Sequence, residues 1–360
     1  MHGVCRRPGD HHRIVLVVAE VAGGIGSRHD DRVPAHIISA SRRTDIPAFF
    51  TPWLMSRIRA GFVLVRNPRN AEHVMRVSLA VEDVIAIVFW SRDYGRLLGH
   101  LAELDDRGFR PCFQFTLTGY GSPMELRAPS IDRTLGQFEQ LARRYGRDRV
   151  VWRYDPIVIG SRHDAAWHID HFRQLAAPIA ASASNAVVSF LDLYPSARRG
   201  LAWVTQTSSE TFHAPPLAQR IEMAGELAAI GAKLGMRVRA CCEPDVAASG
   251  TIQPAACIDR EMIRVVSGLP SIELKAAPTR KGCGCVLVRD IGAYQSCAHG
   301  CVYCYANESP EQGLARSREV DPGANHLGVG DLLENKPAFK GARRQLCLAL
   351  GGEGPGRAGR

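Results

Sequence analysis

The chain has 360 residues, of which 46% are hydrophobic and 22% are charged, and its formal net charge is +9. These values are ordinary for a globular protein and exclude a fibrous or largely disordered chain. The basic excess is concentrated in residues 336–360, where six Lys and Arg residues stand against Glu353 and leave a charge of +5. Such a tail can bind phosphates, so nucleic acid is retained as a candidate partner.

Eleven cysteines, most of them in the last third of the chain, indicate metal ligation and not a secreted disulfide framework. We therefore expect a reducing, cytoplasmic compartment. The apolar stretch 14–26 contains Glu20 and is too short to span a bilayer, so no membrane partner is expected.

Residues 1–35 show no pattern that connects to the rest, and we expect an N-terminal extension that is disordered or reflects a mis-set start. From His36, apolar runs begin at residues 36, 62, 84, 111, 149, 186 and 236. Stretches of helical period lie between them at 95–108, 130–146, 164–180 and 215–235, and Ser130 and Asp164 are N-cap residues for two of these.

The apolar runs are continuous, which is typical of parallel strands buried on both faces. Residues 36–335 therefore predict an α/β fold, a complete or partial TIM-type (β/α) barrel, followed by a disordered basic tail at 336–360. In such a barrel the binding site forms at the carboxyl ends of the strands.

Polar residues close several of the predicted strands. Arginines there can bind a carboxylate or phosphate with two hydrogen bonds, and carboxylates can hold ribose hydroxyls or an amine. Each residue could equally cap a turn or close a loop. The candidates for cofactor binding are Arg42, Arg43, Asp45, Arg153, Asp155 and Glu243.

Four cysteines could form a metal site for zinc or an iron-sulfur cluster: Cys242, Cys257, Cys283 and Cys285. The alternative is that Cys242 and Cys257 are buried small apolar residues. Four other cysteines receive no role: Cys5, Cys112, Cys241 and Cys347.

The run CAHGCVYCYAN places Cys297, Cys301 and Cys304 in a C-x3-C-x2-C spacing with Tyr303 before the last cysteine. Three thiolates in so short a loop can hold three irons of a 4Fe-4S cluster and leave the fourth iron without a protein ligand. A structural zinc loop is the alternative, although His299 lies too near these cysteines in sequence to be a natural fourth ligand.

This spacing and its aromatic residue resemble the cluster loop of radical SAM enzymes. The resemblance implies that the open iron binds the amino and carboxylate groups of S-adenosylmethionine, whose reductive cleavage yields a 5′-deoxyadenosyl radical. It also implies that Tyr303 packs near the adenine and that a flavodoxin or ferredoxin supplies the electron.

Several longer motifs resemble the DUF1848 family of bacterial proteins over roughly residues 36–335, among them IISASRRTDIPAFF from 37, FQFTLTGYG from 113, VVWRYDP from 150 and FLDLY from 190. The HGCVYCYA segment also resembles the spore photoproduct lyase-like group. In ordinary radical SAM enzymes the cysteine loop follows the first barrel strand, whereas here it comes late in the chain. A permuted barrel, with the segment from Cys285 forming a strand beside residues 36–41, would reconcile the two arrangements.

The sequence thus favours a radical SAM-type enzyme that acts on an unknown substrate, for which the arginines suit a phosphate or carboxylate group. The alternative is a non-catalytic iron-sulfur or zinc protein that binds nucleic acid. No catalytic residue could be assigned.

Overall fold

The computed structural model describes residues 35–328 and 332–333. The chain divides into two units, Met1–Val33 and Pro34–Arg360, and all the described residues belong to the second. The basic tail and, apart from Ala35, the N-terminal extension therefore lie outside the described residues.

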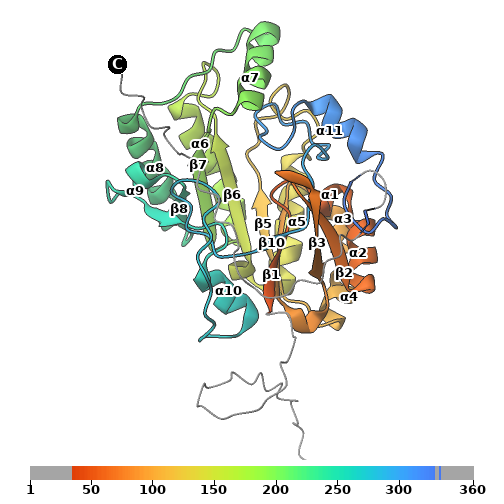
Figure 1. Cartoon of the computed structure of the whole chain (residues 1–360). Helices are drawn as coiled ribbons and strands as arrows, with labels where there is room; N and C mark the ends of the chain where they lie inside the picture. Colours follow the sequence, from red (N-terminus) through yellow and green to blue (C-terminus); the bar gives the residue numbers. More distant parts are fainter. Residues whose placement is uncertain (1–34, 329–331, 334–360) are drawn as a thin grey trace, which may run out of the picture. The chain divides into compact units, whose positions relative to one another are not determined.

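Eight parallel strands form the central sheet of this unit (Figure 1). Their spatial order is β10 (Arg289–Asp290), β1 (His36–Ala40), β4 (Val84–Ser91), β5 (Pro111–Thr116), β6 (Val150–Ile157), β7 (Asn185–Phe190), β8 (Arg237–Cys241) and β9 (Gln253–Ala255). From β1 to β9 the order follows the chain, which confirms the predicted parallel α/β fold. The two edges, β9 and β10, are not joined by any described strand pair, so closure of the barrel stays a prediction.

Residue 62 begins a strand that was wrongly assigned to the parallel sheet. It belongs to a separate antiparallel hairpin of β2 (Phe62–Asn67) and β3 (Asn70–Ser78). The turn between them contains Pro68 and Arg69, and the Arg69 amide donates to the Asn67 side chain. Two residues are enough to reverse the chain but too few for the crossover that a parallel pair requires.

Helices connect the strands of the sheet. They are α1 (Ile46–Phe49), α2 (Thr51–Ala60), α3 (Gly95–Leu98), α4 (Leu101–Asp106), α5 (Ile131–Tyr145), α6 (Ala165–Ile179), α7 (Pro195–Ser208), α8 (Leu217–Lys233), α9 (Pro244–Ala247), α10 (Arg260–Ser267) and α11 (Pro310–Ser317), with short 3-10 turns at Val81–Asp83 and Arg147–Arg149. The predicted caps are confirmed, since Ser130 accepts a hydrogen bond from the Arg133 amide and Asp164 accepts one from the Trp167 amide.

The two faces of the sheet are buried differently, because successive side chains of a strand point to opposite sides. Ile38, Ile87 and Phe113 lie in the main core with side chains of α5, α6 and α8. Ile37 and Val88 point the other way and pack on α10. Burial on both faces explains why the strands are continuously apolar in sequence.

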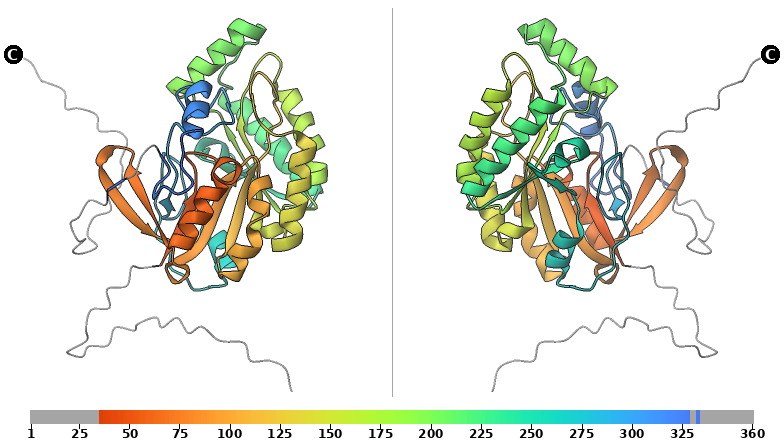
Figure 2. Two further views of the ribbon diagram at one scale, coloured as in Figure 1. Left: turned by 90° about the vertical axis from the view of Figure 1, so that its right-hand side faces the viewer. Right: turned by 90° about the vertical axis from the view of Figure 1, so that its left-hand side faces the viewer.

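The polar strand ends open toward α7 and α11, which lie near each other at that end of the sheet (Figure 2). The side chain of Arg199 on α7 donates to the carbonyl of Glu308, which precedes α11. The segment between β10 and α11 carries the three cysteines of the predicted cluster loop. The fold therefore brings this late segment to the end of the sheet where the site was expected.

Candidate functional site

The cysteine loop, residues 297–304, follows β10, whose Arg289 pairs with Ile38 of β1 in parallel register. This is the pairing that the permuted arrangement requires. Side chains of the two strand ends are tied together, because Ser39 and Ser41 both donate hydrogen bonds to Asp290 at 2.9 and 2.5 Å. The loop thus starts from an edge strand of the parallel sheet.

The connection between β5 and α5 holds the loop from one side. Cys301 forms an antiparallel bridge with Glu125, and the Val302 amide donates to the Met124 carbonyl at 3.0 Å. Gly300 has a φ of +71°, and a Cβ there would lie 2.6 Å from the Arg127 guanidinium. The left-handed φ therefore favours glycine at this turn, and a larger residue would also displace the Arg127 guanidinium.

Helix α7 and the segment that leads into α11 also hold the loop. A Cβ on Gly200 of α7 would lie 1.9 Å from the Val302 carbonyl oxygen, so the helix packs directly against the loop backbone. Ser196 donates to the Cys304 carbonyl at 2.7 Å, and Asn307 donates to the Cys297 carbonyl at 2.7 Å.

The three thiols are partly shielded and close enough to affect one another electrostatically. Burial raises the pKa of Cys301 to about 12, and Arg92 partly offsets the effect. Burial also raises the pKa of Cys297, with further contributions from Asp45 and the other two thiols. In the absence of a cation the loop therefore favours protonated thiols.

Backbone N–H groups reach two of the sulfurs. The Ala306 amide donates to Cys304 Sγ at 3.3 Å, and the amide of His299 is directed to the Cys297 thiol. Hydrogen bonds to thiolate sulfurs are a common feature of iron-sulfur sites and tune their potentials. The donor type, the sequence spacing and the hydrogen bonding of the loop are those that a cluster would require.

A buried polar network lies under the loop. Arg92, at the end of β4, forms an ion pair with Glu125 at 2.7 Å and donates to Tyr303 Oη at 2.7 Å and Thr118 Oγ1 at 3.0 Å. Tyr303 also contacts Glu125. Although burial alone would lower the pKa of Arg92, electrostatic interaction with Cys301 and then with Glu125 raises it well above its usual value.

The predicted cofactor ligands do not gather in one place. Asp45 lies beneath the cysteine loop, but its carboxylate is fully engaged by the Ser91 hydroxyl, the Ala48 and Arg92 amides, and His299 Nε2 at 2.7 Å. These contacts indicate that it orients the loop. Tyr303 is likewise bound by the buried network.

Arg42 and Arg153 both lie over the Trp90 ring, 5.4 and 5.2 Å from its centroid. Arg153 pairs with Asp155, which also accepts from Ser189 Oγ at 3.0 Å. Nε and Nη2 of Arg42 are buried without a hydrogen-bond partner. The Arg42 guanidinium therefore has two nitrogens that form no hydrogen bond within the described residues.

Two predicted residues lie apart from these. Arg43 donates to the Gly292 carbonyl at 3.3 Å and lies over the Tyr294 ring. Glu243 accepts from the Phe190 amide at 2.9 Å and from Arg220 Nη1 at 2.8 Å. Burial raises the pKa of Glu243, and these two donors oppose that rise.

A second group of thiols, here called the edge cysteines, lies at the end of β8 and in the segments that follow β9 and precede β10. Cys241 Sγ lies 3.0 Å from Cys257 Sγ and 3.8 Å from Cys242 Sγ, and thiol contacts extend to Cys283 and Cys285. The group thus includes Cys241, which was not expected to take part, with the four predicted residues Cys242, Cys257, Cys283 and Cys285. Hydrogen bonds from Cys241 and Cys285, and then the charges of Arg153 and Arg42, lower the pKa of Cys257 well below its usual value.

No group of three or more His, Cys, Asp or Glu side chains within residues 35–328 and 332–333 is already arranged around a metal position. Metal binding at either thiol group therefore remains a prediction that requires adjustment of the side chains. In the same described region, no helix is both long and apolar enough to cross a membrane.

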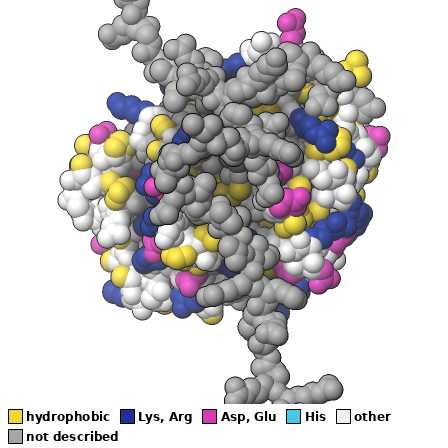
Figure 3. Space-filling view, turned by 60° about the horizontal axis from the view of Figure 1, so that its bottom comes forward, with side chains coloured by type: hydrophobic (Ala, Val, Ile, Leu, Met, Phe, Trp, Pro, Cys, Tyr) yellow, Lys and Arg dark blue, Asp and Glu magenta, His cyan; other side chains and the backbone are white. Residues whose placement is uncertain are grey.

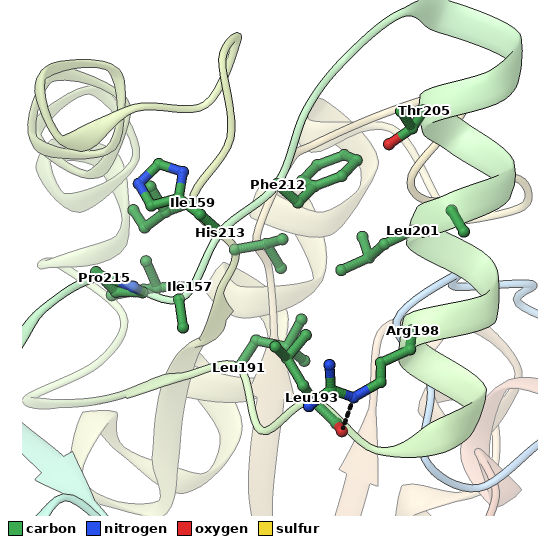
Figure 4. Close-up of a pocket in the computed structure, with 13 residues that line it drawn as sticks. Ile157, Ile159, Leu191, Leu193, Arg198, Leu201, Thr205, Phe212, His213 and Pro215 are labelled. Carbon is green, nitrogen blue, oxygen red and sulfur yellow. Dashed lines mark hydrogen bonds between the residues drawn. The ribbon is translucent and has the colours of Figure 1, made fainter.

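A cavity of about 290 Å³ lies at the ends of β6 and β7, beside α7 (Figure 4). Its wall is mainly apolar, with Ile157, Leu191 and Phe212 among its residues, and Arg198 and His213 are its basic groups. Leu201 of this wall belongs to the same apolar cluster as Val302 and Tyr303 of the cysteine loop. The cavity and the loop are thus neighbours across one packed layer.

The fold and the site define a parallel α/β protein with a cysteine-rich loop at the exit of an edge strand. The family model described as "Domain of unknown function (DUF1848)" matches residues 37–306, and the chain belongs to this family. No curated protein matches it.

Proposed function

We propose that the chain is a radical SAM-type enzyme that holds a 4Fe-4S cluster on Cys297, Cys301 and Cys304. When bound, such a cluster supplies an open iron for the amino and carboxylate groups of S-adenosylmethionine and an electron for its cleavage. The observation that carries the proposal is the place of the loop. It follows an edge strand of a parallel sheet and lies beside the ends of the next strands, where a barrel presents its site.

The surrounding residues have roles that follow from their contacts. Arg92 faces the thiol of Cys301 and would lower the cost of placing negative charge there. Because Arg92 is already paired with Glu125, its guanidinium stays in position and does not move toward the thiols. His299, fixed by Asp45, anchors the first half of the loop.

The substrate side is proposed from charge and shape. The guanidinium of Arg198 and the ring of His213 border the cavity beside α7, and they suit the phosphate- or carboxylate-bearing substrate expected from the sequence. A flavodoxin or ferredoxin remains the proposed electron donor, and the free thiols of the described cysteines suit the cytoplasm.

The test is anaerobic reconstitution with iron and sulfide, followed by reduction with dithionite in the presence of S-adenosylmethionine. We expect the wild type to form 5′-deoxyadenosine and to change its electron paramagnetic resonance spectrum when S-adenosylmethionine is added. Cys301→Ala should do neither. Cys112→Ala is the matched control, because Cys112 is a buried thiol on β5 that contacts the Ile87 carbonyl.

The proposal would be overturned if the chain binds iron or zinc but makes no 5′-deoxyadenosine and its electron paramagnetic resonance spectrum does not change when S-adenosylmethionine is added. The alternative would then be a non-catalytic metal protein that binds nucleic acid. On the described part of the face in Figure 3, Lys and Arg side chains lie among Asp and Glu side chains.

A further inference from the structure

We propose that the edge cysteines bind one soft divalent cation of the zinc class, and that this ion ties the two edges of the parallel sheet together. This site is separate from the cysteine loop and does not depend on the proposed enzyme activity.

The position of the edge cysteines supports the structural part of the proposal. Cys241 ends β8, and Cys257 comes just after β9, which is one edge of the sheet. Cys283 and Cys285 come just before β10, which is the other edge. The Val286 amide donates to the Ile258 carbonyl at 3.0 Å, so the two segments already meet at this point. An ion bound here would link residues that no described strand pair joins.

The sulfur distances favour a single ion over a cluster. Four thiolates around zinc, with zinc–sulfur bonds of about 2.3 Å, place neighbouring sulfurs about 3.8 Å apart in a tetrahedron. Cys241 and Cys242 are separated by 3.8 Å, and Cys241 and Cys257 by 3.0 Å. In a 4Fe-4S cluster each thiolate binds its own iron, which holds the sulfurs farther apart than these.

The backbone at Cys242 contributes to the grouping. Two successive residues of an extended strand point to opposite faces of the sheet. Cys242 instead has a φ of 59°, in the left-handed region that residues other than glycine rarely adopt. Its thiol therefore turns toward that of Cys241 and joins the same group.

Charge supplies an independent argument. A divalent ion with four thiolates has a net charge of about −2 by simple addition. Arg42 and Arg153 both act electrostatically on Cys257 and would offset part of that charge. Arg153 has Asp155 as a partner, whereas the buried Nε and Nη2 of Arg42 have none. A buried guanidinium with unused donors beside thiols is the environment expected for a thiolate-bound metal.

Binding would exchange one set of bonds for another. The thiols now hydrogen-bond to one another, and four of them would rotate toward the ion, release their protons to solvent and bind as thiolates. No oxidant or reductant is required.

The test uses the full chain with Cys297, Cys301 and Cys304 all replaced by alanine, so that only the edge cysteines remain as a thiol-rich site. The reduced, metal-free protein is titrated anaerobically with Co²⁺ as a spectroscopic probe. We expect about one ion per chain, with thiolate-to-cobalt charge-transfer absorption and the visible bands of tetrahedral cobalt, all abolished by Zn²⁺. Binding without thiolate absorption, or no stoichiometric binding, would overturn the site.

Variants within this background define the ligands. Cys257→Ser combined with Cys285→Ser should lose the tetrahedral spectrum, because only three edge thiols then remain, and Cys112→Ser should keep it. Arg42→Gln should weaken cobalt affinity about tenfold, as loss of a supporting group around a metal does. An unchanged affinity in Arg42→Gln, or a Cys241–Cys257 disulfide in protein prepared without air, would contradict the proposal.

The two proposals fail independently. Cobalt binding at the edge cysteines with no 5′-deoxyadenosine from the intact chain would overturn only the proposed enzyme. Formation of 5′-deoxyadenosine with no cobalt binding in the triple variant would overturn only the edge site.

Discussion

The buried ion pair of Arg92 and Glu125 offers a quantitative test of how the cysteine loop is supported. Their side chains are 10% and 2% exposed and lie 2.7 Å apart. Replacement of Arg92 by Met would leave the Glu125 carboxylate buried without its counter-charge. Removing one partner of a buried pair costs about 3–5 kcal/mol, so Arg92→Met and Glu125→Gln should each lower the unfolding free energy by roughly that amount.

The measurement is a double-mutant cycle by urea unfolding, with all variants prepared under the same anaerobic conditions. The double variant should lose much less than the sum of the single losses, because it no longer contains an unpaired charge. The exposed pair Arg59 and Glu103 is the control and should show a much smaller coupling, since water screens it. Equal couplings in the two cycles would refute the claim that burial makes the Arg92 pair important.

Two further predictions concern packing and pH. Gly200→Ala should destabilise the chain by about 1–3 kcal/mol and reduce iron retention, because the added Cβ would overlap the Val302 carbonyl. Gly136→Ala on α5, which has open space around it, is the control and should be neutral or slightly stabilising, so equal melting temperatures for the two variants would contradict the packing argument. His168 is hydrogen-bonded to Tyr154, and burial lowers its pKa to about 4. As pH falls from 6.5 to 4 the unfolded chain therefore binds the proton first, and the unfolding free energy should drop by about 3 kcal/mol. His168→Gln should flatten this part of the pH profile of unfolding, and an unchanged slope would contradict the role of His168.

Much of the fold could be predicted because local patterns and long-range packing agree. Continuous apolar runs such as the one from Val84 became buried parallel strands, and Ser130 and Asp164 start helices where their hydroxyl and carboxylate oxygens suggested. The run from Phe62 was wrongly predicted to join the parallel sheet, because an apolar hairpin strand and a parallel strand have the same pattern over five residues. Short strands such as β9 carry too few residues to leave a pattern.

The site was less predictable. The cysteine spacing identified Cys297, Cys301 and Cys304 as candidate ligands without structural information. Glu125 has no signal in sequence, since it lies in an irregular connection and matters only through its contacts with Arg92 and Tyr303. Cys241 received no role from the sequence, and the left-handed backbone of Cys242 is what brings both thiols together. Such three-dimensional effects depend on tertiary packing rather than on local pattern.

The pairing of β1 with β10 has a consequence for biosynthesis. Ser39 and Asp290 are hydrogen-bonded partners 251 residues apart, so one edge of the sheet cannot form until nearly the whole described chain has left the ribosome. Contacts of such long separation slow folding. The loop that follows β10 emerges later still. Any cofactor that it takes would therefore be inserted into a largely folded protein, and truncation ahead of residue 289 would leave β1 with an unpaired, aggregation-prone edge.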